Sequence, residues 1–160
     1  MKLQYNYNVS KPVESFTQIK KEVEDLEVFI TAGDFGKSPF TPYAIHHAQV
    51  TDDHFNFFVL NRDPVIIHPD LMEYLQSHVI INPRVKGYEE DSLREVKEGC
   101  MSFPYRQPKL VKRYLQILVE YEIPDGEGLK KVEKMLQGSF AQIFQHEIGH
   151  GEGKNIYFKK

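Results

Sequence analysis

The stretch His146-Glu147-Ile148-Gly149-His150 constrains this 160-residue chain more than any other part of it. Two histidines four residues apart share one face of a helix, about one turn apart, where both imidazoles can bind one metal ion. Glu147 then points to the flank of that ion, where a carboxylate can take a proton from a water molecule. The alternative is a chance pair of histidines on a polar helix surface.

The residues around this stretch predict the helix that the spacing requires. Ser139 can cap its start, and Phe140 and Phe144 lie on its inner face. The glycines at positions 149, 151 and 153 predict its end.

The rest of the chain predicts one helix followed by strands. A start signal at Ser10 and Pro12, followed by apolar residues at spacings of three and four, predicts a helix from there to about Gly33. Residues 55–60 and 79–81 are rich in β-branched and aromatic residues and predict strands, the second ending at Asn82-Pro83. Alternating apolar residues over 113–123 predict one half-buried strand.

Other segments are less specific. Residues 63–76 could hold a short helix or a turn, and residues 129–136 could be a hairpin strand or the start of a helix. The charged stretch 89–98 is interpreted as a solvated edge or loop without chemistry. The order of elements predicts an α+β fold, with an N-terminal helix and mostly antiparallel sheets packed around the C-terminal metal-binding helix. We expect residues 1–160 to form a single domain.

Composition limits the kinds of partner and the cellular compartment that we expect for this chain. The chain has 20 Lys+Arg against 23 Asp+Glu and no long basic run, which argues against direct nucleic-acid binding. Residues 1–10 are polar and do not have the apolar segment typical of a signal peptide, and no apolar stretch approaches the roughly 20 residues that a membrane helix needs. The single cysteine, Cys100, cannot form an internal disulfide. We therefore expect a cytoplasmic protein in a reducing compartment.

A catalytic metal site needs a third protein ligand and one open position. Glu152 is too close to His150 to reach the same ion, and only ten residues follow His150, so the third ligand should lie upstream. Cys100 is the natural candidate, although a lone cysteine is more often a small buried residue.

Two motifs resemble those of the peptide deformylase family. Glu98-Gly99-Cys100-Met101-Ser102 is similar to the family's Glu-Gly-Cys-Leu-Ser motif, and residues 145–150 are similar to its Gln-His-Glu-x-Asp-His helix, in the same order along the chain. The resemblance extends over most of the chain, from about residue 10 to residue 158.

The chain also departs from the family pattern. Residues 42–49 match the family's first motif, Gly-x-Gly-Leu-Ala-Ala-x-Gln, only at Ile45 and Gln49, and Gly149 stands where the family usually has Asp. His46 and His47 fall in this divergent motif. We interpret them as polar residues at the rim of the pocket, with an extra ligand or a proton relay as the alternative.

The resemblance implies a metal-dependent hydrolase that removes the formyl group from N-formylmethionyl peptides of nascent proteins and releases formate. It implies Cys100, His146 and His150 as the metal ligands. Glu147 would be the base, and Gln49 and the backbone N–H of Met101 would stabilise the oxyanion. The implied cofactor is one divalent metal ion, Fe(II) first, with Zn, Ni or Co also compatible with this ligand set.

Two other functions stay open. One is an inactive, metal-holding relative that acts as a binding protein, which the divergent first motif suggests, and the other is a metallopeptidase of the His-Glu-x-x-His type. Expected partners are formylmethionyl peptides and nascent chains, with transient proximity to the ribosome and without a membrane. We expect a monomer. The short tail after His150 resembles compact phage or organellar members, which lack a long C-terminal helix.

Overall fold

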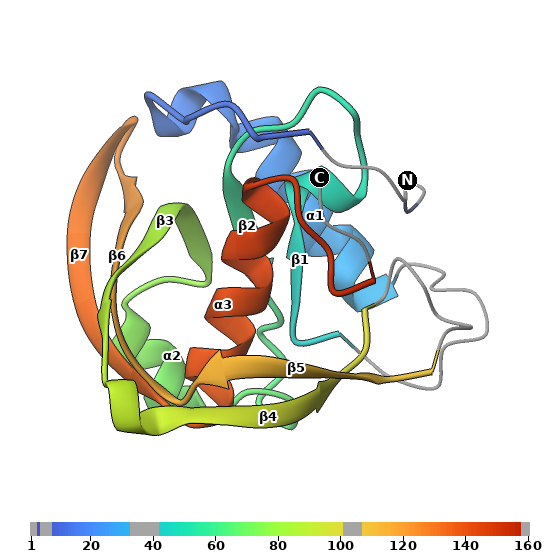
Figure 1. Ribbon diagram of the computed structural model, residues 1–160. Helices are drawn as coiled ribbons and strands as arrows, with labels where there is room; N and C mark the ends of the chain where they lie inside the picture. Colours follow the sequence, from blue (N-terminus) through green and yellow to red (C-terminus); the bar gives the residue numbers. More distant parts are fainter. Residues whose placement is uncertain (1–2, 4–7, 33–41, 101–106, 158–160) are drawn as a thin grey trace.

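The computed structural model describes residues 3, 8–32, 42–100 and 107–157. Figure 1 shows helix α3 in the middle of the molecule, with strands on several sides of it. In chain order the elements are η1 (Phe16–Gln18), α1 (Lys20–Ala32), β1 (Ala44–His46), η2 (His47–Gln49), β2 (Phe57–Leu60), α2 (Pro69–Leu75), β3 (Val79–Tyr88), η3 (Glu90–Ser92), β4 (Leu93–Glu98), β5 (Lys109–Tyr114), β6 (Gln116–Asp125), β7 (Gly128–Gln137) and α3 (Ser139–Gly151).

The strands form two antiparallel sheets. The larger has five strands in the order β1-β2-β3-β6-β7, and β4 pairs with β5 in a separate two-stranded sheet. Helices and antiparallel sheets thus occur in one chain, with the C-terminal helix against both sheets (Figure 1). The α+β prediction is confirmed.

The side chains of β2 point alternately to the two faces of the large sheet, and both faces are covered. Phe57 and Val59 belong to the apolar cluster that contains the buried side of α1. Phe58 and Leu60 belong to a second cluster that contains α3, where the Phe58 ring meets the Phe144 ring edge-on with centroids 5.1 Å apart. Because successive side chains of a strand point to opposite faces, one short apolar run contributes to both cores.

The N-terminal helix begins later than predicted. Residues near Ser10 are extended, because the Ser10 N–H donates to the Gly151 carbonyl (2.8 Å) and the backbone of Lys11 forms an isolated parallel β-bridge with Phe55. A short 3-10 turn follows, and α1 begins only at Lys20. This N-terminal segment is thereby tied to the end of α3.

Two strand predictions need correction. The strand expected over residues 113–123 is two strands in different sheets, because Leu115 leaves the ladder and its N–H donates to Ser92 O (3.0 Å). The strand expected over residues 79–81 continues to Tyr88, with a register shift between Ile81 and Arg84, where Asn82 has a φ of 49°. A bulge absorbs the proline that cannot donate to the ladder.

The segment that the sequence left open between strand and helix is a strand. Residues 129–136 lie in β7, which pairs with β6 throughout its length. Gly126 adopts a φ of 60° in the turn between them, a conformation that glycine adopts at little cost. Val132 and Leu136 are buried.

Residues 63–76, for which the sequence predicted either a short helix or a turn, contain helix α2.

The predicted cap of α3 is shifted by one residue, because Gly138 occupies the N-cap with a φ of 63° and Ser139 is the first helical residue. In the described part of the chain, every helix is too short or too polar to cross a bilayer.

Candidate metal centre

The structure brings the three predicted metal ligands together. His146 and His150 lie one turn apart on α3, and Cys100 lies two residues after the end of β4. One ligand atom from each residue lies within 4.8 Å of the others, and the Cys100 Sγ to His150 Nε2 distance is 3.7 Å. All three side chains are buried or partly buried, so a cation among them would be shielded from bulk water.

Both imidazoles are oriented through their Nδ1 atoms. His146 Nδ1 lies 2.8 Å from Glu98 Oε1, and His150 Nδ1 donates to the Lys154 carbonyl (3.1 Å). Each bond keeps a proton on Nδ1, so Nε2 is the nitrogen that can bind a metal ion. A thiolate with two imidazoles held this way fits a divalent transition metal with one open position.

Charge around the cluster favours a cation. Burial lowers the pKa of His150 well below its usual range, so this ring is neutral and available as a ligand. Burial also opposes a charge on His146, but hydrogen bonds with Cys100 and Glu98 raise the pKa of His146 to about 10. The Glu98 carboxylate beside this ring thus attracts positive charge.

Glu98 is a site residue that the sequence interpretation missed, since the charge pattern of segment 89–98 predicts a solvated edge. The rest of β4 is mostly exposed, but Glu98 is 7% exposed and also accepts two bonds from Arg113, each of 2.8 Å. Burial raises the pKa of Glu98, yet the bonds from Arg113 and His146 outweigh it and lower the value to about 2. Its position directly before Gly99-Cys100 was the available signal.

Glu147 is buried on the flank of the two histidines. It is 5% exposed, and within the described ranges no group hydrogen-bonds its Oε2 atom. Burial raises the pKa of Glu147 to about 7. A buried carboxylate oxygen that the described residues leave unbonded is suited to accept a proton from a ligand or a water molecule.

Gln49 lies beside the sulfur. Its Oε1 atom accepts from the His46 N–H (2.9 Å), which directs Nε2 toward Cys100 Sγ, 3.9 Å away. Gln49 is 2% exposed. Met101, the other predicted oxyanion donor, lies outside the described residues.

His46 and His47 are not at the rim of a pocket. Both are buried, and their Nδ1 atoms accept backbone N–H bonds from Ala48 and Phe55, each of 3.0 Å. Burial lowers the pKa of His46 to about 3 and that of His47 to about 4. Their Nδ1 atoms bind the local backbone, and neither residue belongs to the ligand cluster found among the described residues.

Gly151 makes room for the His46 side chain. His46 Nε2 lies 3.2 Å from Asn56 Oδ1, and this pair packs against the backbone of Gly151. A Cβ atom at position 151 would clash with Asn56 Oδ1 and lie 3.1 Å from His46 Nε2. The His46 side chain, which is part of the divergent motif, therefore fits only because residue 151, at the end of α3, is a glycine.

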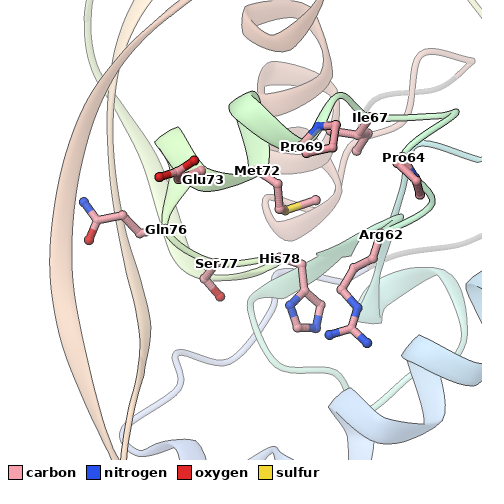
Figure 2. Close-up of a pocket in the computed structure, with 9 residues that line it drawn as sticks. All are labelled: Arg62, Pro64, Ile67, Pro69, Met72, Glu73, Gln76, Ser77 and His78. Atoms are coloured by element: carbon pink, nitrogen blue, oxygen red, sulfur yellow. The ribbon is translucent and has the colours of Figure 1, made fainter.

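Two hollows of the molecule are candidates for the site. A cavity of about 380 Å³ lies beside the cluster, lined by β5, by His146 and His150, and by residues 154–156. A wider, open hollow of about 900 Å³ lies at α2, where Figure 2 shows Arg62 and His78 with their side chains on the same side. None of the predicted site residues lines the second hollow, so we place the chemistry at the first.

Comparisons with known proteins identify the family. The sequence profile of the polypeptide deformylase family matches residues 52–159. A peptide deformylase of Thermus thermophilus is 32% identical over 153 residues, which cover 90% of this chain and 71% of that protein. One from Macrococcus caseolyticus (strain JCSC5402) is 37% identical over 82 residues, 51% of this chain and 43% of that protein. The chain thus spans less than half the length of that relative.

A solved structure is also similar. The crystal structure of a peptide deformylase from Thermus thermophilus has a TM-score of 0.69 and 28% identity, and the match covers 94% of this chain and 77% of that one. The profile match includes more than half of the chain, and it contains Cys100 and the two histidines of α3. On these grounds, the chain belongs to the peptide deformylase family.

Proposed function

We propose that residues 1–160 form one catalytic domain that removes the formyl group from N-formylmethionyl peptides and releases formate. The observation that carries this proposal is the convergence of Cys100, His146 and His150 within 4.8 Å in a chain of this family. The buried Glu147 carboxylate beside them supplies a base where an amide hydrolase needs one.

The three ligands would hold one divalent metal ion, for which we propose Fe(II). When bound, such an ion acts as a Lewis acid and lowers the pKa of a coordinated water toward neutrality. One thiolate and two imidazoles also accept Zn, Ni or Co. Elemental analysis of protein purified without oxygen tests which metal the cell supplies.

Glu147 moves the proton in the proposed reaction. Its Oε2 atom, which lacks a partner within the described residues, takes the proton of the attacking water. The same carboxyl group then gives that proton to the leaving amine, so that formate and a free N-terminus result. Burial keeps the carboxyl pKa near 7, which suits a group that must both accept and donate.

Gln49 stabilises the charge that develops on the formyl oxygen. Its Oε1 is engaged by the His46 N–H, so the Nε2 amide is held with its donor toward the cluster. A donor that is fixed before the reaction needs no reorganisation when the oxygen becomes negative. The backbone N–H of Met101 is the second proposed donor, by resemblance to the family motif.

The remaining proposals concern the setting. Formylmethionyl peptides and nascent chains are the proposed substrates, with the protein acting as a monomer close to the ribosome. A reducing, cytoplasmic environment would keep the Cys100 thiolate available as a ligand.

Turnover of formyl-Met-Ala-Ser tests the function. We expect protein loaded with Fe(II) without oxygen to release formate and Met-Ala-Ser, with acetyl-Met-Ala-Ser as the matched control that stays intact. Mass spectrometry separates the alternatives, because a metallopeptidase would instead cleave the Met-Ala bond. A protein that holds metal but leaves every formyl peptide intact would contradict the proposal and favour a binding role.

A further inference from the structure

A buried amide contacts the sulfur of Cys100, and the proposed reaction does not use it. Asn155 lies four residues beyond the end of α3 and is 6% exposed. Its Nδ2 atom donates to Cys100 Sγ at 3.3 Å, closer than Gln49 Nε2 at 3.9 Å. An N–H donor at this distance is within the usual range for a hydrogen bond to sulfur, because sulfur is larger than oxygen.

The orientation of the Asn155 amide is fixed from its other side. Its Oδ1 atom accepts the Tyr157 N–H at 3.0 Å, so its nitrogen is the atom that faces the sulfur. Tyr157 is anchored in turn, since its hydroxyl donates to the Gln107 carbonyl at 2.8 Å. The donor toward Cys100 is therefore held before any metal ion binds.

Two consecutive residues hold two of the proposed ligands. The Lys154 carbonyl accepts from His150 Nδ1 at 3.1 Å, and the Asn155 amide donates to Cys100 Sγ. Lys154 N–H also donates to Gly149 O at 2.8 Å, which ties this segment to α3. Cys100 Sγ and His150 Nε2 are 3.7 Å apart. Residues 154 and 155 therefore help to fix the position of both of these neighbouring ligand atoms.

We propose that Asn155 is a positioning residue for the Cys100 ligand. Its N–H bond fixes the sulfur relative to His150 and withdraws electron density from the thiolate, so that the sulfur donates less charge to a bound metal ion. This inference rests on the proposed metal centre and adds to it a contact that orients one ligand and tunes its donor strength.

Cobalt(II) provides a readout that does not depend on activity. A thiolate bound to Co(II) gives a near-ultraviolet sulfur-to-metal charge-transfer band, and its energy rises when a hydrogen bond stabilises the sulfur lone pairs. Asn155→Asp, measured at pH 8, keeps the size and the oxygen that accepts the Tyr157 N–H but loses the donor. Asn155→Leu removes both contacts. We expect the band to move to lower energy in both variants, and Co(II) affinity to fall about 10-fold in Asn155→Leu, where the sulfur is no longer held in place and no carboxylate is added.

Tyr157→Phe is the matched control, because it loosens the same segment through the hydroxyl but keeps the backbone N–H that orients Asn155. We expect its band to stay at the parent energy. Unshifted bands in Asn155→Asp and Asn155→Leu, with the same affinity, would overturn the role of Asn155 and leave the metal centre standing. A parent protein without any sulfur-to-cobalt band would overturn both.

Discussion

Gln49 contributes two groups to the site from one side chain. Its oxygen accepts the His46 N–H, and its nitrogen points to the cluster. Gln49→Leu should lower kcat about 10²–10³-fold, because the oxyanion loses a fixed donor. Gln49→Glu keeps an oxygen for the His46 N–H and should lower kcat as well. Steady-state kinetics on formyl-Met-Ala-Ser checks both, and parent kcat in Gln49→Leu would show that another group stabilises the oxyanion.

Glu98 orients His146 and should determine how tightly metal is held. Glu98→Gln replaces the charged acceptor of the His146 Nδ1–H by a neutral amide and leaves Arg113 without its anion. We expect metal affinity to fall about 10–100-fold in chelator competition. Glu95→Gln, on the exposed part of the same strand, is the control and should bind like the parent. Equal affinity in the two variants would remove Glu98 from the site.

His46 should make the protein less stable in acid. Its pKa is about 3 in the folded state and near 6.5 when unfolded, so between these values only the unfolded chain takes the proton. The free energy of unfolding should therefore fall by about 1.4 kcal/mol per pH unit below pH 6.5 from this group. His46→Asn keeps an oxygen for the Ala48 N–H and removes that slope. Urea unfolding of both proteins from pH 7 to pH 4 measures it, and parallel curves would contradict the buried, neutral histidine.

The sequence alone could predict most of the candidate site, since the histidine spacing and the Cys100 motif identify the ligand types that the structure brings together. It could not place Glu98, because a pattern of charged residues does not show which one of them turns inward at the end of a strand. It also gave the wrong environment for His46 and His47. Those rings are buried because backbone N–H groups and Gly151 accommodate them, and such contacts join residues far apart in the chain.

Replacing either of the two glycines of helix α3 by alanine should change the stability of the protein, but in opposite directions. A Cβ atom at Gly149 would have only ordinary contact, 3.9 Å from the Lys154 Cβ, whereas one at Gly151 would clash with Asn56. Gly149→Ala should raise the free energy of unfolding by about 0.5–1 kcal/mol through helix propensity. Gly151→Ala should lower it by about 1–3 kcal/mol, because Asn56 must shift away from His46. Thermal unfolding of the two variants compares them directly, and a stabilised Gly151→Ala would contradict the packing described.

Element boundaries depend on partners that the sequence does not show. The apolar alternation over residues 117–123 predicted a half-buried strand correctly, since Ile117, Val119 and Tyr121 are fully or almost fully buried. The break at Leu115 arises because Ser92, on another element, accepts its N–H. Likewise, residues 129–136 become a strand because β6 offers a complete antiparallel edge.

At the scale of the whole molecule, both sheets and the N-terminal segment are arranged around α3. The Ser10 N–H binds the Gly151 carbonyl at the end of the helix, and the Tyr114 N–H binds Gln145 Oε1 (3.0 Å) in its middle. The two proposed histidine ligands therefore lie on a helix that is fixed along its length, while Cys100 follows a strand of the smaller sheet. The proposed centre depends on the complete fold, because Cys100 lies 46 residues before His146 in the sequence.

The central claim is that this centre hydrolyses formyl peptides with Glu147 as the base. The most direct measurement compares metal content and formate release in the parent and in Glu147→Ala, both loaded with Fe(II) without oxygen. We predict equal metal per chain, because the three ligands remain, and a rate of formate release lower by about 10²–10⁴-fold in the variant. Formate release at the parent rate by Glu147→Ala, with the metal bound, would contradict the account.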